Sequence, residues 1–348
     1  MGIMGVREVH LVLAGIVIEM FYVTQNMGKM SGQGGKMGLT PKERAEAALS
    51  LKIPDRVPTF ELEFQLTKEL IGRDYLTQSD LDGAPPARRE RLLKENAELF
   101  IEVAEALDYS IIPLQSISDL DALVTMARHM RSLIGDRYMI WAHADGTFAI
   151  PDGEHMMEFA FWLADKPEEV HAVAQANVDE QIERAKQLFD AGVDSFILCA
   201  DYCFNQGPFM SPTMFREYVT PYLADNIARL KEMGAWVIKH TDGDMMPILD
   251  QIVECEPHGL HSLDPMAGVD IAEVKRLYGD KVCLIGNVNC ALLQTGTPEE
   301  IDASANYCLD HGKPGGGYIF STSNVAFRGM PLENYLRVHK IWKARRAY

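Results

Sequence analysis

The sequence lacks the features that define several large classes of protein. None of its six cysteines forms a C-x-x-C pair, so we expect reduced thiols in a cytoplasmic protein and no disulfide framework. The apolar run "LVLAGIVI" ends at Glu19 and is too short to span a bilayer. Lys and Arg number 33 against 50 Asp and Glu, and the net charge of −17 argues against nucleic acid or an anionic membrane as a partner.

Residues 1–38 differ in pattern from the rest of the chain. Their stretch "GKMSGQGGKMG" is rich in glycine, whereas "LTPKERAEAAL" has the pattern of a helix start, with Thr40 as N-cap, Pro41 in the first turn and Glu43 completing a capping box. We therefore predict a single folded domain over residues 39–348. The leader, residues 1–38, is predicted to be flexible or to result from a start codon assigned too early.

Short apolar, β-branched runs alternate with longer segments of helical periodicity after residue 39. This alternation predicts an α/β fold with a parallel sheet, and eight strands are the number that closes a (β/α)8 TIM barrel. An open doubly wound sheet would carry a G-x-G-x-x-G loop after an early strand, which this chain lacks. The eight predicted strand runs are 57–64, 110–114, 138–146, 195–202, 235–244, 259–265, 282–289 and 317–324.

Polar residues follow nearly every one of these runs. Barrel enzymes build their active sites at the carboxyl ends of the strands, so the pattern predicts a polar cup that acts as an active site. The stretch "HTDGD", with His240 and Asp242, is its most concentrated part. The strand-end residues are Glu61, Glu63, Gln115, His143, Asp145, Asp201, Tyr202, His240, Asp242, Asp264, Asn287, Asn289, Ser323 and Asn324.

From about Leu39 to Tyr348 the chain resembles the uroporphyrinogen decarboxylase superfamily. The resemblance lies in "PKERAEAALSLKIPDRVP", "GPFMSPTMFREYVTPYL", "HTDGD", "GLHSLDP", "IGNVNCALLQTGTPEEI" and "GGGYIFSTSNVAFRGMPLENYL". It implies a uroporphyrinogen decarboxylase-like TIM barrel. It also implies one of two chemistries: decarboxylation of a porphyrinogen, or methyl transfer from a methyl-corrinoid protein to coenzyme M or tetrahydrofolate.

The decarboxylase chemistry is poorly matched by these residues. A substrate with eight carboxylates calls for arginines in the pocket, because guanidinium groups bind carboxylates in pairs of hydrogen bonds. The decarboxylases resemble one another in an arginine-rich segment after the first strand, where this chain has "ELEFQLTKELIGRDY" with only Arg73. The aspartate that follows their second strand is displaced here to Asp119. Uroporphyrinogen-III decarboxylation therefore remains an alternative only.

The zinc-dependent coenzyme M branch is also poorly matched. Its ligands resemble H-x-C on the fifth strand with a further cysteine on the eighth. Here Asp242 replaces the first cysteine, and the eighth strand offers Ser321, Thr322, Ser323 and Asn324 but no sulfur. A zinc site needs at least three well-placed ligands, so no bound metal is expected.

The sequence here, "STSNVAFRGMPLENYL" in particular, resembles the glycine-betaine branch, which lacks the zinc ligands and uses tetrahydrofolate. We therefore predict a methyltransferase of one-carbon metabolism that moves a methyl group between a methylated corrinoid (cobalamin-type) protein and tetrahydrofolate, without zinc. Because an amine lone pair is free at neutral pH, such an acceptor needs placement and a route for its proton rather than a metal.

Within that prediction, His240 and Asp242 handle the proton or position the pterin, and Glu63 acts from the opposite wall. Strict alternation along the strand points Glu61 and Glu63 to the same, inward side. Segment 149–167, with its methionines and aromatic residues, is the candidate docking surface for the corrinoid protein. The predicted substrate-binding residues are Glu61, Asp201, Tyr202, Asp264, Asn287, Asn289 and Asn324.

Three other functions stay open at this point. They are a zinc-dependent methylcobamide:coenzyme M-type methyltransferase, the decarboxylase, and a non-catalytic corrinoid or pterin carrier. A structural histidine bonded to Asp242 or to a backbone carbonyl is the simplest alternative for His240 itself.

Overall fold

The computed structural model describes residues 12–13, 16–17 and 38–348. The chain divides into two units, Met1–Gly38 and Leu39–Tyr348. In the first unit, β1 (Val12–Leu13) pairs antiparallel with β2 (Ile16–Val17). Residues 1–11, 14–15 and 18–37 of the predicted leader lie outside the described part of the chain, so that prediction stands as it was made.

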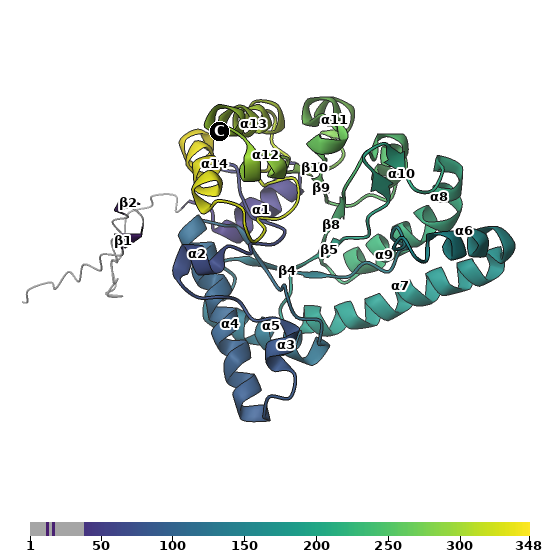
Figure 1. The fold of residues 1–348 in the computed structure, drawn as a ribbon, viewed down its shortest axis with the longest axis horizontal. Helices are drawn as coiled ribbons and strands as arrows, with labels where there is room; N and C mark the ends of the chain where they lie inside the picture. Colours follow the sequence, from purple (N-terminus) through teal and green to yellow (C-terminus); the bar gives the residue numbers. More distant parts are fainter. Residues whose placement is uncertain (1–11, 14–15, 18–37) are drawn as a thin grey trace, which may run out of the picture. The chain divides into compact units, whose positions relative to one another are not determined.

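A curled sheet of seven parallel strands forms the centre of the second unit (Figure 1). Each of its strands falls within one of the predicted runs. Their spatial order is β11-β10-β9-β8-β5-β4-β3. The strands are β3 (Ile111–Pro113), β4 (Met139–His143), β5 (Ser195–Leu198), β8 (Trp236–Thr241), β9 (Gly259–Ser262), β10 (Cys283–Ile285) and β11 (Tyr318–Ile319).

Helices connect the strands and lie around the outside of the sheet (Figure 1). The short antiparallel pair β6 (Cys203–Phe204) and β7 (Gly207–Pro208) follows β5. The helices are α1 (Pro41–Leu49), α2 (Thr67–Ile71), α3 (Gln78–Leu81), α4 (Pro86–Leu107), α5 (Leu120–Ile134), α6 (Met156–Asp165), α7 (Pro167–Asp190), α8 (Pro212–Tyr218), α9 (Thr220–Glu232), α10 (Leu249–Glu254), α11 (Ile271–Tyr278), α12 (Cys290–Thr295), α13 (Pro298–Gly312) and α14 (Leu332–Arg345), with 3₁₀ turns η1 (Met246–Ile248) and η2 (Pro265–Ala267).

Side-chain caps explain where several helices begin. At α1 the Thr40 hydroxyl accepts the Glu43 N–H at 3.2 Å, and the Glu43 carboxylate accepts the Thr40 N–H at 2.7 Å. This is the capping box predicted from the sequence, and it satisfies two N–H groups that the helix leaves without partners. Thr297 and Glu300 repeat the same box at α13.

The predicted first strand, 57–64, is the one departure from the expected barrel. It forms only isolated bridges, Thr59 with Phe320 and Phe64 with Ala326. Single backbone bonds also join it to both ends of the sheet, from Ser110 N–H to Thr59 O at 2.7 Å and from Phe320 N–H to Pro58 O at 2.9 Å. The residues described therefore form a seven-stranded parallel sheet whose two ends meet across this segment.

Two apolar clusters occupy the two faces of the sheet. The smaller one combines Trp141, Ile197, Ile238 and Ile285 with small side chains of α1. Helix α1 contacts β3, β4 and β11, which lie at the two ends of the strand order, so it covers one end of the curl. The larger cluster lies between the sheet and the outer helices. The smaller apolar cluster and α1 thus fill the inside of the curl at one end. The polar side chains lie at the other end, where the strands have their carboxyl ends.

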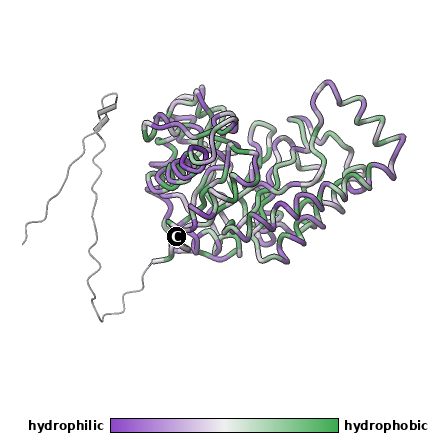
Figure 2. The backbone as a smooth tube through the Cα atoms, turned by 90° about the horizontal axis from the view of Figure 1, so that it is seen from below, coloured by the Kyte–Doolittle hydropathy of each residue, from purple (hydrophilic) through white to green (hydrophobic). Residues whose placement is uncertain are grey.

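The long outer helices are amphipathic, as Figure 2 shows by the alternation of polar and apolar colour along them. In α7 the buried residues Val170, Ala174, Val178 and Ile182 recur every four positions. This spacing puts them on one helical face. Among the described residues, no helix is both long and apolar enough to cross a membrane.

Candidate active site

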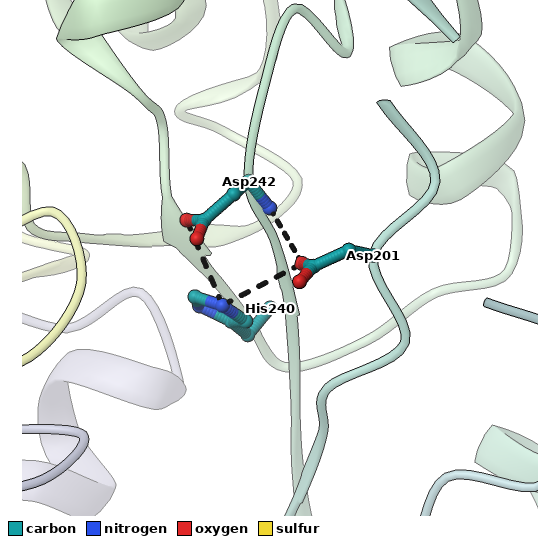
Figure 3. A group of neighbouring side chains, drawn as sticks. All are labelled: Asp201, His240 and Asp242. Carbon is teal, nitrogen blue, oxygen red and sulfur yellow. Dashed lines mark hydrogen bonds and ion pairs between the residues drawn. The ribbon is translucent and has the colours of Figure 1, made fainter. Parts of the chain in front are cut away.

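Three predicted site residues, Asp201, His240 and Asp242, meet at the carboxyl ends of β5 and β8 (Figure 3). Nε2 of His240 lies 3.8 Å from Oδ1 of Asp201 and 3.7 Å from Oδ1 of Asp242. The Asp242 N–H donates to Oδ1 of Asp201 at 2.9 Å, which ties the two strand ends together. The Asp201 side chain is 47% exposed and that of His240 only 4%. The cluster therefore has an open carboxylate above a buried ring.

The Asp242 carboxyl is held by one donor from β9 and one from the segment after β11. Its Oδ1 accepts the Ser262 hydroxyl at 2.6 Å, and its Oδ2 accepts the Asn324 amide. Burial, together with the charges of Asp201 and Asp264, raises the pKa of Asp242 to about 7, although the Ser262 bond acts in the opposite direction. A carboxyl with such a pKa can take up or release a proton near neutral pH, as a general acid or base must.

Two histidines stack below this carboxyl. Nδ1 of His240 lies 2.7 Å from Nδ1 of His261, so one ring donates to the other. Burial lowers the pKa of His240 far below its usual value and that of His261 to about 3, so both rings are neutral at pH 7. When His240 carries its proton on Nδ1, its Nε2 faces the two aspartates as a free acceptor.

Gly243 sets the turn that follows these residues. Its φ is +83°, and a Cβ there would lie 2.5 Å from the carbonyl oxygen of Cys203 in β6. The next residue, Asp244, donates its N–H to Phe204 O at 2.9 Å. Only glycine allows this conformation and this close backbone approach together. The packing of "HTDGD" against β6 thus fixes where Asp242 points.

Asp264 and Asn324 also lie at this cluster, as predicted. Asp264 accepts the Gly243 N–H at 3.3 Å and the Met266 N–H at 2.9 Å, so its carboxylate braces the turn after β8 and begins η2. Asn324 reaches Asp242 from the segment after β11. Together with Asp201 they place polar atoms from three parts of the chain around one carboxyl.

Three other predicted residues have partners inside the chain. Tyr202 is buried, and its hydroxyl bonds the Thr147 hydroxyl at 2.6 Å. The Asn287 amide donates to Leu263 O at 2.6 Å. The Asn289 side chain caps α12. These contacts hold loops and strand ends in place, a role that the residue type alone does not distinguish from ligand binding.

The two glutamates of "ELEF" do not share one side, so the prediction from strict alternation is wrong. Glu63 is half-buried, accepts an N–H from Gln65 at 3.0 Å, and lies near enough to His143 on β4 to favour its protonated form. Glu61 is 2% exposed and accepts bonds from Thr322 and Tyr335. A bend at Leu62 breaks the two-residue alternation between them.

Sequence reasoning missed a buried ion pair next to the cluster. Lys239 is fully buried, and its Nζ lies 2.9 Å from Oδ2 of Asp145 and 4.1 Å from the ring centre of Tyr202. Burial opposes ionisation of Asp145, but Lys239 and the donors of Thr147 and Ala200 together hold its pKa below the usual value. The signal was a lysine inside an otherwise apolar strand, which requires a buried partner.

The cluster of Asp201, His240 and Asp242 brings its donor atoms within 4.8 Å of one another, a spacing that one cation can bridge. It does not match the thiolate zinc site of the coenzyme M branch. Asn324, in the segment after β11, directs an amide N–H at Asp242 in the region where the resemblance implies a cysteine for that branch. Burial also raises the pKa of each cysteine thiol, so the thiols are protonated at neutral pH.

Comparison with known proteins shows which family the chain is similar to. Residues 118–346 match the family model described as Uroporphyrinogen decarboxylase (URO-D). A uroporphyrinogen decarboxylase from Aromatoleum aromaticum is 27% identical over 179 residues, which are 48% of this chain and 46% of that protein. The methylcobamide:CoM methyltransferase MtaA from Methanosarcina barkeri is 26% identical over 240 residues, 66% of this chain and 65% of that protein.

A solved methyltransferase from Methanosarcina mazei superposes with a TM-score of 0.68 at 18% identity, covering 88% of this chain and 98% of that one, which shows a shared fold. The chain spans about half, or less, of the length of the curated decarboxylases that it matches. The relatives are enzymes of two kinds, decarboxylases and methyltransferases. Because the family model covers well over half of the sequence, the chain belongs to the uroporphyrinogen decarboxylase (URO-D) family.

Proposed function

We propose that this protein transfers a methyl group between a methylcobamide carried by a corrinoid protein and tetrahydrofolate, with no metal ion of its own. The observation that carries the proposal is the composition of the strand-end cluster, where Asp242 and Asn324 stand in place of thiolates beside a neutral His240. We further propose that segment 57–64 closes the seven-stranded sheet into a (β/α)8 barrel whose mouth holds the acceptor.

The cluster suits an acceptor that loses a proton as it gains a methyl group. In that step the lone pair of N5 forms a bond to the methyl carbon, the cobalt–carbon bond breaks with its electron pair on cobalt, and the N5 proton leaves. Nε2 of His240 is the free acceptor for that proton, and Asp242, with a pKa near 7, is the second group able to hold it. Asp201, 47% exposed above them, is available to accept N–H bonds from the pterin edge.

The proposed docking surface for the corrinoid protein is the outer side of α6. Phe148, Phe159 and Trp162 pack against one another with ring centres 5.6–5.8 Å apart and fix this helix on the domain. Met157 and Phe161, four positions apart, are 63% and 60% exposed on its free face. Exposed large apolar side chains on one helical face are typical of protein-binding surfaces.

A second acceptor class, a thiol, is favoured by one observation. The coenzyme M methyltransferase from Methanosarcina barkeri matches 66% of this chain, more than the decarboxylases quoted above do. Decarboxylation gains no such support. Its substrate calls for arginines that can bind carboxylates, and Arg73, the arginine that follows "ELEF", is paired with Glu102.

The deciding experiment uses free methylcobalamin as the methyl donor and follows its absorbance with tetrahydrofolate, with coenzyme M, or with no acceptor. We expect loss of methylcobalamin with tetrahydrofolate and formation of methyltetrahydrofolate in equal amount. Methyl transfer to coenzyme M alone would show that the acceptor is a thiol and not tetrahydrofolate. Consumption of uroporphyrinogen III with release of carbon dioxide would overturn it.

The metal-free part of the proposal has its own test. Purified protein is expected to hold far less than one zinc per chain, and its activity with tetrahydrofolate should survive chelators. Elemental analysis that finds one tightly held zinc per chain, lost together with activity, would contradict it.

A further inference from the structure

A buried series of polar side chains runs from the cluster into the wall of the sheet. It begins with the 2.7 Å contact between Nδ1 of His240 and Nδ1 of His261. Nε2 of His261 lies 3.5 Å from the hydroxyl of Ser321, which neighbours Thr322, a donor to Glu61, and which is itself among the groups that lower the pKa of Glu61. The four residues of this series, His240, His261, Ser321 and Glu61, are each 3% exposed or less.

Glu61 ends this series between the sheet and α14. Its Oε1 accepts the Thr322 N–H at 3.2 Å and the Tyr335 hydroxyl at 3.1 Å, and its Oε2 accepts the Thr322 hydroxyl at 2.6 Å. The Tyr335 hydroxyl also bonds that of Tyr109, just before β3. A carboxyl buried this deeply is costly to ionise unless it has such donors. The proposed chemistry at the rim does not by itself require it.

We propose that Glu61 is the proton store of the methyl-transfer step and exchanges protons with the acceptor through Ser321, His261 and His240. This inference rests on the proposed function, because it assigns the destination of the acceptor's proton. The docked corrinoid protein and the acceptor cover the mouth during the step, so a store inside the wall removes the need for water at the reacting atoms.

The transfer balances as a relay. The acceptor's proton moves to Nε2 of His240, whose Nδ1 proton moves to Nδ1 of His261. The Nε2 proton of His261 moves to the Ser321 oxygen, and the Ser321 hydroxyl proton moves to the Glu61 carboxylate. The rings and the hydroxyl stay neutral, and Glu61 becomes a neutral carboxylic acid. When the products leave, the proton returns along the same path to water at the mouth.

The acidity of Glu61 suits a store that works in both directions. Burial raises its pKa to about 8, against the opposing effect of its hydroxyl and N–H donors. The titratable groups that face it are Tyr335 on α14, Tyr109 before β3 and Cys290 on α12, and burial raises the pKa of each, so all stay neutral. Among these four groups Glu61 is therefore the one that changes charge near neutral pH, whereas Asp242, with a pKa of about 7, lies at the rim end of the series.

The first test reads the path without any methyl transfer. Infrared spectra in deuterated buffer follow the carbonyl band of the protonated Glu61 carboxyl, identified by its absence in Glu61→Gln. We expect Ser321→Ala to slow deuterium exchange of this band by roughly tenfold, the effect of losing one hydrogen-bonded link. The control Ser195→Ala removes another buried strand hydroxyl, one without a partner, and should leave the exchange rate unchanged.

Tyr335→Phe tests a contact of Glu61 that lies outside the proposed path. It removes a donor on the α14 side of Glu61, away from the rim, so exchange should continue at the wild-type rate. Unchanged exchange in Ser321→Ala, or slowing in Tyr335→Phe alone, would overturn the proposed path.

The second test uses turnover. Methylation of tetrahydrofolate needs an ionised store, so its rate should rise with pH with a midpoint of about 8, and the reverse reaction should fall over the same range. Glu61→Gln should remove the part of both profiles that is centred near pH 8 and slow the step by about tenfold or more. Wild-type rates that do not change between pH 7 and 9 (roughly one unit either side of that midpoint) would refute the role of Glu61 as proton store. If the wild type transfers no methyl group at all, the proposed function fails and the exchange test still decides the path.

Discussion

Replacing Lys239 by Met tests the buried ion pair beside the cluster. The Nζ atom donates to Asp145 at 2.9 Å, to Ala200 O at 2.9 Å and to Leu198 O at 3.3 Å, and the side chain has no exposed surface. Met has similar volume but no charge and no donor. The variant therefore leaves one buried carboxylate without its cation and removes one donor from each of two carbonyls.

The expected loss follows from those contacts. Removing one member of a buried pair typically destabilises a protein by about 3–5 kcal/mol, because the remaining charge is left unpaired. The side-chain and backbone donors of Thr147 and Ala200 stay on Asp145, so we expect the lower end of that range, about 3 kcal/mol. Against a total stability of about 5–15 kcal/mol, this is a large fraction.

Urea unfolding of wild type and Lys239→Met at pH 7 measures the difference in the free energy of unfolding. The double variant Lys239→Met/Asp145→Asn should lose less than the two single variants added together, because a neutral amide needs no cation. The control Lys340→Met removes an exposed lysine of α14 and should change stability by less than about 0.5 kcal/mol. A loss below about 1 kcal/mol in Lys239→Met would refute the reasoning, since it is the size expected of an exposed pair.

The pH dependence gives the same prediction a second check. In the wild type the pKa of Asp145 is lowered, so its contribution to stability is present above the unfolded pKa and is lost as the pH falls through the folded one. In Lys239→Met the unpaired carboxyl is expected to take up a proton more readily. The stability difference between the two proteins should therefore narrow as the pH is lowered.

Three further predictions concern the cluster and the leader. His240→Ala should slow methyl transfer by about 10²–10⁴-fold while the melting curve stays close to that of the wild type, and unchanged turnover would make this histidine structural. Asp242→Asn should remove a pH dependence of stability. The folded pKa of Asp242, near 7, exceeds the unfolded value, so wild-type stability falls as the pH rises from about 4 through 7. An equal fall in the stability of the variant would contradict the raised pKa. Deleting residues 2–38 is expected to leave the melting temperature nearly unchanged, and a large loss of stability or of an oligomer would show that the leader packs against the domain or a partner.

Most of the sheet could be predicted because buried parallel strands are continuous apolar runs between amphipathic helices. The run 57–64 has the same appearance but is not a regular strand. Pro58 has no N–H to donate, the chain bends at Leu62, and the Thr322 N–H bonds the carboxylate of Glu61 instead of a backbone carbonyl. Competition between a side chain and the backbone for one donor is not visible in a hydropathy pattern.

The sequence predicted that polar side chains gather at the carboxyl ends of the strands, but not which of them contact one another. "HTDGD" pointed to His240 and Asp242 because polar residues follow nearly every predicted strand, and a whole cup of them is harder to explain by caps and turns than a single strand end. The contacts of Asp242 with Ser262 and Asn324, and of Lys239 with Asp145, join positions 20 to 94 residues apart. Strand alternation predicts the side on which each of these residues lies, but the choice of partner depends on the register between strands.

The sparse bonding of segment 57–64 has a consequence for how the protein is made. The Thr59 hydroxyl bonds Phe320 O, 261 residues later, and the Trp342 indole bonds Val57 O, 285 residues later. During synthesis this segment leaves the ribosome early and has no partner on that side until β11 and α14 emerge. The nascent sheet therefore carries an unpaired edge for most of translation, which is a template for aggregation. A pause in translation just before residue 318 should therefore cause the most aggregation, and the nascent chain should need chaperones most at that stage.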